Sequence, residues 1–321
     1  MTHKIILAPM EGLVDAPLRD ILTRIGGIDR CVSEFIRVTE GPLHLGTIQR
    51  IVPESLNGWV TAAGVPVHPQ LLGSDVDWLA HNAALLAELG APAVDLNFGC
   101  PAKTVNRHRG GAVLLREPET LYQIVSAVRA AVPAHIPVTT KMRLGYSDTS
   151  QTLECASALE QAGSAEIAVH ARTKADGYKP PADWDWLARI REASAIPIIA
   201  NGDVNDLLDY QRILEVSGCA QVMIGRGLVA RPDLGRSIRR SVQQTAVSPM
   251  HWDELQPWVV DFYQQTRQRV ADRYAPGRLK QWLGFLARNY AEGQQLFDRV
   301  RRQTCADEVQ QLLCGSLGKA A

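Results

Sequence analysis

The stretch IPIIANGDVNDLLDYQRILEVSGCAQVMIGRG, residues 196–227, holds two short apolar runs on either side of a helix-period segment. The runs 196–202 and 221–227 have the composition of strands. The segment 206–218 between them ends in glycine, which is favoured just after the last turn of a helix. A strand, a helix and a further strand in this order predict two parallel strands joined by a crossover helix.

The same alternation extends toward the N-terminus. Further strand-like runs occupy residues 4–10, 31–36, 68–73, 93–99, 137–145 and 166–172. Helix-period segments between them occupy residues 15–27, 77–90, 118–132 and 151–163. Eight strand units in about 230 residues predict an α/β fold in which a parallel sheet closes into a (β/α)8 TIM barrel. An open doubly wound sheet is the alternative, but no G-x-G-x-x-G follows the first strand to favour it.

The strand signal stops near residue 246. Trp, Phe and Leu on one side and Arg on the other are typical of a small helical bundle, and this pattern occupies residues 251–274, 277–290 and 295–303. We therefore predict two domains, which are a barrel over residues 1–246 and a C-terminal helical domain over residues 247–321.

Composition indicates an ordinary globular protein, because the 321 residues are 46% hydrophobic and 21% charged. The first apolar run is too short for a signal peptide and no segment approaches the length of a membrane span, so we expect a cytoplasmic protein without membrane contact. The six cysteines lie far apart, with no Cys-x-x-Cys pair and no Cys/His grouping at zinc-ligand spacing. The pattern predicts neither disulfides nor a metal site and favours a reducing compartment.

Charge is distributed unevenly along the chain, although the formal net charge is zero. Residues 1–225 carry 19 Lys and Arg against 25 Asp and Glu, whereas residues 226–306 carry 14 against 7, a net charge of +7. Such asymmetry indicates an anionic polymer or surface as partner. A solvated helical face without a partner is the alternative.

Polar residues and two glycines gather at the C-terminal ends of the predicted strands, where barrels of this class carry their active sites. They are Glu11, Glu34, Arg37, Gln70, Asn97, Cys100, Lys141, Arg143, His170, Arg172, Asn201, Gly202, Gly225 and Arg226. Gly202 and Gly225 follow the last two strands, where such barrels commonly bind phosphate through backbone N–H groups, and Arg226 could neutralise its charge. Tight turns without a ligand are the alternative explanation for these glycines.

For three of these side chains the sequence allows more than one role. Lys141 could form a Schiff base, lie beside an electron-accepting ring, or pair with a carboxylate as a structural residue. His170 could contact a ligand or be a structural histidine. Cys100 stands between glycine and proline, where a strand gives way to a loop. A thiol with a pKa near ~8.5 is mostly protonated at neutral pH, so Cys100 suits a general acid; a nucleophile and a plain turn cysteine are the alternatives.

Seven short motifs follow one another along the barrel: APMEG at 8–12, QLLG at 70–73, DLNFGCPAKTV at 95–105, KMRLG at 141–145, VHARTK at 169–174, IIANGD at 198–203 and VMIGRG at 222–227. In this order they resemble the signatures of the tRNA-dihydrouridine synthases, which are FMN-dependent flavoproteins. GRLKQWL at 277–283 and HARTKADGY at 170–178 resemble the bacterial subgroup that reduces uridine 16 of the tRNA D-loop.

The resemblance implies a role for each candidate residue. FMN would contact Pro9, Met10, Glu11, Gln70, Lys141 and His170, and its phosphate would lie on Asn201, Gly202, Asp203, Gly225 and Arg226. Reduced FMN would pass hydride to C6 of uracil, Cys100 would give a proton to C5, and NADPH would supply the electrons. The tRNA would be held by Arg37, Asn97, Tyr178, Lys280, Trp282 and Arg301, with Asn97 on the uracil edge and Tyr178 near the flipped base.

Two other functions stay open at this stage. A flavin-dependent dehydrogenase of a free pyrimidine, similar to the dihydroorotate dehydrogenases, would need the same flavin site but no basic tail. A barrel that binds RNA without catalysis would need no flavin. Under the main hypothesis we expect a monomer that contains no metal.

Overall fold

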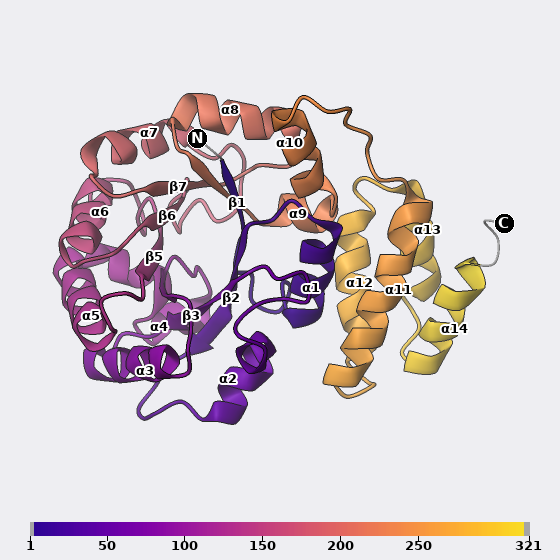
Figure 1. Cartoon of the computed structure of the whole chain (residues 1–321), viewed down its shortest axis with the longest axis horizontal. Helices are drawn as coiled ribbons and strands as arrows, with labels where there is room; N and C mark the ends of the chain where they lie inside the picture. The colour runs from indigo at the N-terminus through magenta and orange to yellow at the C-terminus, as the bar shows by residue number, and fades with distance from the viewer. Residues whose placement is uncertain (1–2, 318–321) are drawn as a thin grey trace.

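The computed structural model describes residues 3–317 and has eight parallel strands closed into a barrel, each beside its neighbours in sequence (Figure 1). The strands are β1 (Lys4–Leu7), β2 (Arg30–Arg37), β3 (Val67–Leu72), β4 (Val94–Phe98), β5 (Val138–Arg143), β6 (Ile167–His170), β7 (Ile198–Asn201) and β8 (Gln221–Ile224). β8 pairs with β1, with Lys4 opposite Gln221 and Leu7 opposite Ile224, and this pairing closes the sheet. The predicted (β/α)8 barrel is confirmed.

Helices surround the barrel (Figure 1). Those that the sequence predicts are α1 (Ala16–Ile25), α3 (Val76–Glu88), α5 (Pro118–Ala131), α6 (Thr152–Gln161) and α8 (Leu207–Ser217). Those that it does not predict are α2 (Leu45–Ile51), α4 (Lys103–Arg107), α7 (Trp184–Ala193), α9 (Arg226–Ala230) and α10 (Leu234–Val242), with the 3-10 turns η1 (Pro53–Leu56) and η2 (Gly111–Arg116). Helices α4 and α9 have five residues each, so their sequences are too short to display a helical period.

Capping residues explain where two of these helices begin and end. Asp15 accepts the N–H of Leu18 at 3.2 Å before α1, and Asp206 accepts the N–H of Asp209 at 2.8 Å before α8. Helix α8 is followed by Gly218, whose φ of 64° lies in the left-handed region that favours glycine. The caps fix the loops that follow β1 and β7 at the open end of the barrel.

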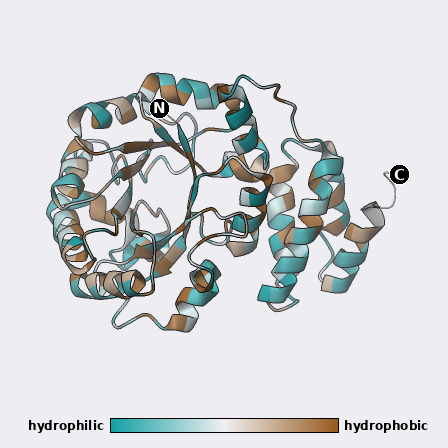
Figure 2. Cartoon of the chain, in the orientation of Figure 1, coloured by the Kyte–Doolittle hydropathy of each residue, from teal (hydrophilic) through white to brown (hydrophobic). Residues whose placement is uncertain are grey.

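Apolar side chains fill two layers. One cluster, inside the barrel, consists of Ile6, Ala8, Val32, Ala168, Ile199 and Met223. The larger cluster lies between the strands and the surrounding helices, and Figure 2 shows apolar residues along the strands and on parts of the helices. Because consecutive strand residues point to opposite faces, Ile5 and Leu7 join the outer layer while Ile6 joins the inner one.

The C-terminal helices lie beside the barrel, next to α1 and α9 (Figure 1). They are α11 (Trp252–Arg269), α12 (Ala275–Leu286), α13 (Ala291–Val300) and α14 (Ala306–Leu317). The predicted domain boundary at residue 246 falls in the segment between α10 and α11, and the division itself stays a prediction. Within residues 3–317, no helix is both long enough and apolar enough to cross a membrane.

Candidate active site

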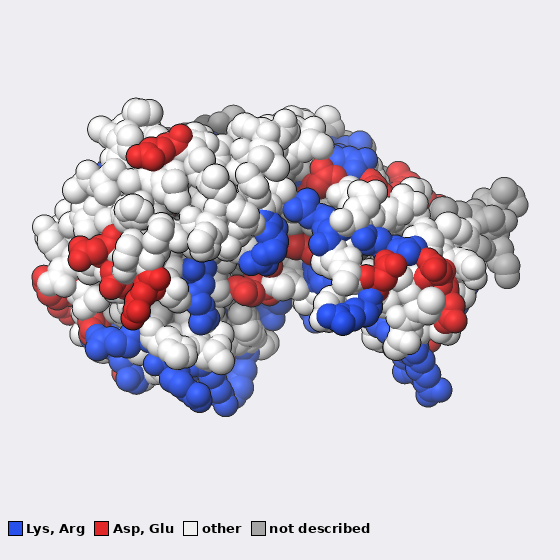
Figure 3. Space-filling view, turned by 90° about the horizontal axis from the view of Figure 1, so that it is seen from below, with Lys and Arg blue, Asp and Glu red and all other residues white. Residues whose placement is uncertain are grey.

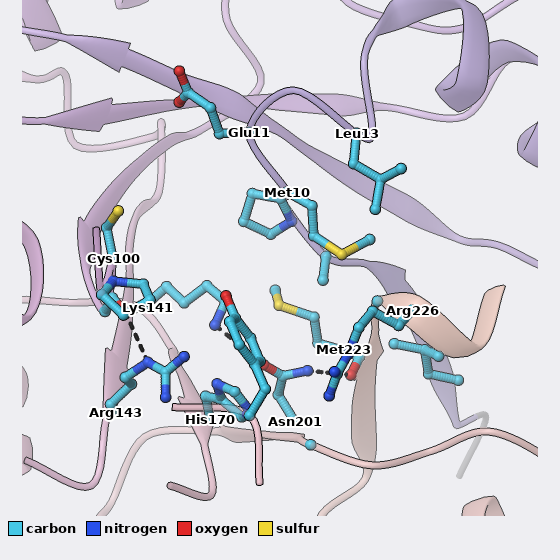
Figure 4. Close-up of a pocket in the computed structure, with 18 of the residues that line it drawn as sticks. Met10, Glu11, Leu13, Cys100, Lys141, Arg143, His170, Asn201, Met223 and Arg226 are labelled. Carbon is cyan, nitrogen blue, oxygen red and sulfur yellow. Dashed lines mark hydrogen bonds between the residues drawn. The ribbon is translucent and has the colours of Figure 1, made fainter. Parts of the chain in front are cut away.

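A cavity of about 630 Å³ opens at the C-terminal ends of the strands. All the predicted catalytic and cofactor residues line it, and so do Asn97 and Tyr178: the full set is Pro9, Met10, Glu11, Gln70, Asn97, Cys100, Lys141, His170, Tyr178, Asn201, Gly202, Asp203, Gly225 and Arg226. Figure 4 shows Cys100 and Glu11 on one side of the cavity, and Met223 and Arg226 on the other. The cavity also contains two residues from α12 that the sequence analysis missed, Gln281 and Phe285.

The backbone of Cys100 is held from both sides. Its N–H donates to Oδ1 of Asn97 at 2.9 Å. Its carbonyl oxygen accepts Nδ2 of Asn106 at 2.9 Å and the N–H of Ala112 at 3.1 Å. The loop at the end of β4 therefore places the thiol at the cavity edge by hydrogen bonds to strand, helix and 3-10 turn.

Gly111 packs against this loop and tolerates no larger residue. Its φ of +68° is left-handed, and a Cβ there would lie 2.8 Å from the carbonyl oxygen of Cys100. Neither Gly111 nor Asn106 stood out in the sequence, although both fall in the NRHRGG run that follows Cys100. Only their packing against Cys100 identifies them as part of the site.

Burial raises the pKa of the Cys100 thiol, and the nearby carboxylate of Glu11 acts in the same direction. A hydrogen bond from the backbone of Ala102 and the positive charges of Arg143 and Arg37 oppose this rise. Since the net direction is upward, the thiol is protonated at neutral pH. This state suits a proton donor and disfavours a thiolate nucleophile.

Lys141 projects from β5 into the cavity and is buried. Its Nζ donates to Oδ1 of Asn201 at 3.1 Å, and Nδ2 of Asn201 donates in turn to the carbonyl oxygen of Met223 at 2.8 Å. Across the described residues, no carboxylate forms an ion pair with Lys141, so the structural alternative of a Lys–carboxylate pair does not apply. Burial and the charge of Arg143 lower the pKa of Lys141 to about 8, against the opposing effect of Asp95.

His170 ends β6 and is buried beside several cations. Burial lowers its pKa well below the ordinary value, and the charges of Arg143, Lys141 and Arg172 lower it further. The imidazole is therefore neutral. Its Nε2 lies 3.4 Å from a guanidinium nitrogen of Arg172, which can only donate, so this arrangement favours a proton on Nδ1.

The loops after β7 and β8 meet at Asp203, whose φ is +54°. Its carboxylate pairs with the buried Arg172, accepts the N–H of Ala182 at 2.9 Å, and lies 3.7 Å from Arg226. The side chain of Asp203 thus holds the loops together. The guanidinium of Arg226 also stacks on the ring of Tyr178, 4.8 Å from its centroid.

Two glycines keep this end of the cavity open. A Cβ on Gly202 would lie 3.1 Å from Ala182 and 3.3 Å from the ring of His170. A Cβ on Gly225 would lie 3.2 Å from Sδ of Met10. Side chains at either position would therefore crowd the space in which we predict a phosphate.

The four remaining tRNA candidates lie outside this cavity. Arg37 is exposed at the end of β2 and lines a neighbouring cavity of about 630 Å³. Arg301 is exposed, 3.6 Å from Asp298. Lys280 is half-buried, and its Nζ donates to the carbonyl oxygen of Gln303 at 2.5 Å.

Trp282 requires a correction, because it is fully buried between α12 and the barrel. Its indole N–H donates to the carbonyl oxygen of Val229 at 3.0 Å, and its ring packs edge-on against Phe262. A side chain without accessible surface does not contact tRNA in this arrangement. Trp282 is instead part of the packing that joins α12 to α9.

Lys and Arg side chains border the notch between the barrel and the C-terminal helices on the face in Figure 3. This arrangement fits an anionic partner that lies across both parts of the chain. In the part of the chain that the structure describes, no group of three or more His, Cys, Asp or Glu side chains could hold a metal ion.

Solved structures with similar folds include an old yellow enzyme homologue from Zymomonas mobilis, at a TM-score of 0.52 and 14% identity over 79% of this chain and 92% of that one. A 2-naphthoyl-CoA reductase matches at a TM-score of 0.57 and 13% identity over 75% of this chain and 50% of that one. At these identities the likeness concerns the fold alone.

Sequence relatives are much closer. A tRNA-dihydrouridine(16) synthase of Aquipseudomonas alcaligenes is 56% identical over 97% of this chain and 98% of its own length. The enzyme of the same name from Neisseria meningitidis serogroup A is 51% identical over 97% of this chain and 93% of its own length. The family model for dihydrouridine synthases matches residues 6–311, so the chain belongs to the dihydrouridine synthase family.

Proposed function

We propose that this protein is an FMN-dependent enzyme that reduces uridine 16 in the D-loop of tRNA to 5,6-dihydrouridine, with NADPH as the electron donor. The observation that carries the proposal is the position of Cys100, a protonated thiol at the edge of a cavity whose opposite side is built from glycine-rich loops. Uridine 16 is the position named for relatives that are 56% and 51% identical to this chain.

The cavity fits FMN in size and in chemistry. Its volume of about 630 Å³ lies within the usual range for cofactor pockets. Gly202 and Gly225 leave room where a Cβ would intrude, and Arg226 supplies positive charge for a phosphate beside them. Gln70 and Lys141 also line the cavity, so they would meet the flavin ring, with Lys141 next to the region that gains negative charge on reduction.

The residues of the chain divide the chemistry between them. When bound, reduced FMN supplies a hydride to C6 of uracil, whose double bond is conjugated to a carbonyl group. Cys100 gives its proton to C5, where negative charge develops, and the raised pKa of the thiol keeps that proton available. Asn97 lies at the same edge and would hold the pyrimidine, although its Oδ1 is already used by Cys100.

A uridine inside folded tRNA must leave its stack to reach this cavity, so the enzyme needs a grip on the surrounding phosphates. The positive charge of residues 226–306 and the basic border of the notch in Figure 3 supply such a surface. A dehydrogenase that acts on a free pyrimidine needs no such basic surface. This difference separates the main proposal from its first alternative.

The direct test incubates the purified protein with FMN, NADPH and unmodified tRNA and maps dihydrouridine along the product. We expect dihydrouridine at position 16, none in tRNA that carries cytidine there, and negligible turnover of free uracil. Comparable turnover of free uracil would favour the pyrimidine dehydrogenase. Tight tRNA binding by a protein that takes up no flavin would favour the RNA-binding barrel.

Arg301→Glu is expected to weaken tRNA binding roughly 10-fold at low salt and to reduce the salt dependence of the affinity, because a phosphate contact is lost. Arg301 is exposed and lies 3.6 Å from Asp298, so its charge is available to tRNA. Filter binding across a salt series measures the effect. Arg212→Glu makes the same charge change at an exposed position of α8 and should leave the affinity unchanged. Equal affinities for the Arg301 and Arg212 variants would count against the proposed tRNA surface.

FMN affinity of the apoprotein is expected to fall as pH rises through about 8, because Lys141 has its pKa lowered to about 8 and loses its charge above that value. Below this pH the charged ammonium attracts the flavin. Quenching of FMN fluorescence on binding gives the affinity across the neutral to alkaline range. Lys141→Gln should bind FMN more weakly at neutral pH and remove this pH dependence. An unchanged pH dependence in Lys141→Gln would assign it to another group.

A further inference from the structure

A chain of hydrogen bonds runs from the barrel interior to the turn that carries Cys100. It begins at Asp95, which none of the roles above uses, and passes through the side-chain amides of Gln70 and Asn97. We propose that Asp95 is a positioning residue that anchors both amides in the barrel interior and thereby holds the Cys100 turn in place. The proposal rests on the proposed function, because it concerns the proton donor of that reaction.

Strand register brings the first members of the chain together. Gln70 on β3 pairs with Asp95 on β4, and Asp95 pairs with Thr139 on β5. All three side chains are buried. Oδ2 of Asp95 accepts Nε2 of Gln70 at 2.6 Å, and Oδ1 accepts the hydroxyl of Thr139 at 2.5 Å. Burial raises the pKa of Asp95 to about 6, so the carboxylate is ionised at neutral pH. An ionised carboxylate accepts hydrogen bonds and donates none, so Gln70 must turn its NH2 group toward Asp95.

The orientation of Gln70 agrees with the one that the loop requires of Asn97. Because Nε2 of Gln70 faces Asp95, its Oε1 faces Asn97 and accepts Nδ2 at 2.7 Å. Oδ1 of Asn97 is thereby directed at the loop, where it accepts the N–H groups of Gly99 and Cys100 at 2.9 Å each. Turning either amide over would place N–H against N–H or oxygen against oxygen in a buried site.

Both ends of this chain of hydrogen bonds impose the same direction on the amides. At the loop, the N–H groups of Gly99 and Cys100 can only donate, and in the barrel interior the ionised carboxylate of Asp95 can only accept. Asp95 is the end of the chain that is formed by a side chain, and it supplies the buried acceptor that Nε2 of Gln70 needs. Each amide nitrogen also keeps a second N–H, and since Gln70 and Asn97 line the cavity, these groups can serve a carbonyl oxygen of a bound ring. The chain of hydrogen bonds therefore positions the Cys100 turn and also favours ligands that present hydrogen-bond acceptors.

The test compares Asp95→Asn, Asp95→Ala and Asp95→Ser in the FMN-loaded enzyme. Asn can still offer an oxygen to Gln70 while its NH2 group donates to the hydroxyl of Thr139, so Asp95→Asn should keep the kcat for tRNA reduction within about 3-fold of wild type. Asp95→Ala leaves Nε2 of Gln70 without its buried acceptor, so both amides lose their anchor in the barrel interior and kcat should fall about 10- to 100-fold. Asp95→Ser retains a polar group that can donate or accept, and it should be impaired even if the Ala variant does not fold.

A second readout measures Cys100 directly through its rate of alkylation by iodoacetamide as a function of pH. We expect Asp95→Ala and Asp95→Ser to change this profile and Asp95→Asn to keep it. Thr140→Val is the matched control, because it removes a buried hydroxyl that bonds Ser164 one position along β5 from Thr139. It should leave both kcat and the alkylation profile unchanged, whatever it does to stability.

The outcomes separate the two proposals. A wild-type protein that reduces no tRNA would contradict the proposed function, while the alkylation profiles would still test the role of Asp95. Asp95→Asn as impaired as Asp95→Ser, or Asp95→Ser identical to wild type in both readouts, would overturn the positioning role.

Discussion

Cys100→Ala is expected to keep FMN bound but to lose nearly all reduction of tRNA uridines, by about 100-fold or more. The methyl group of alanine has no proton to give to C5, and water has no fixed position from which to replace it. The loop should survive the change, because the bonds to Asn97, Asn106 and Ala112 use only the backbone of residue 100. Single-turnover reduction of unmodified tRNA by the pre-reduced enzyme measures the effect on chemistry alone.

Cys305→Ala is a suitable control, since Cys305 is exposed just before α14 and lies outside the cavity. It should match wild type in both FMN content and turnover. If Cys100→Ala retained more than about a tenth of wild-type turnover, the thiol could not be the principal proton donor. Loss of FMN from the variant would point to a structural role for the side chain instead.

The barrel could be predicted because its signals are local. The strand and helix of each βα unit lie within fewer than about 40 consecutive residues. The topology of the barrel then places the C-terminal end of every strand at the same rim. Lys141, His170 and Asn201 could be assigned to one rim on this basis, and the structure brings all three to the cavity. Their hydrogen bonds could not be predicted, because the bond between Lys141 and Asn201 joins residues that are 60 positions apart in the sequence.

The missed residues of the site depend on contacts between distant segments. In the sequence, Asp95 is a single polar residue inside a predicted strand. Only the register of β3, β4 and β5 reveals its neighbours Gln70 and Thr139. Gln281 and Phe285 reach the cavity from α12, so no pattern in the barrel sequence indicates that they belong to the site. Amphipathic spacing indicates that a helix has a buried side, but it does not say which surface that side meets.

Trp282 illustrates this limit, because the family resemblance implies a tRNA contact for it and the sequence does not reveal that the side chain is buried. In the structure it joins α12 to the end of α9, the helix that begins at Arg226. Asn289 adds a second bond, from its Nδ2 to the carbonyl oxygen of Ala230 at 2.9 Å. The C-terminal helices therefore hold the last carbonyl groups of a short helix whose first residues lie at the predicted phosphate site.

Trp282→Ala is accordingly expected to lower the free energy of unfolding by about 3–5 kcal/mol, as for other buried aromatic residues cut to alanine. FMN affinity should fall with it, because α9 loses the support that fixes Gly225 and Arg226. Trp282→Phe keeps most of the packing against Phe262 but leaves the Val229 carbonyl without its donor, so it should cost about 1–3 kcal/mol. Thermal or urea unfolding and FMN titration measure both effects.

The phenylalanine variant decides between packing and direct tRNA contact. If Trp282 acts through α9, Trp282→Phe lowers stability and FMN affinity together, and the protein saturated with FMN binds tRNA as wild type does. If Trp282 contacts tRNA, the same variant weakens tRNA binding while the unfolding free energy and FMN affinity stay unchanged. Full burial of the side chain favours the first result, because a contact with tRNA would require α12 to separate from α9.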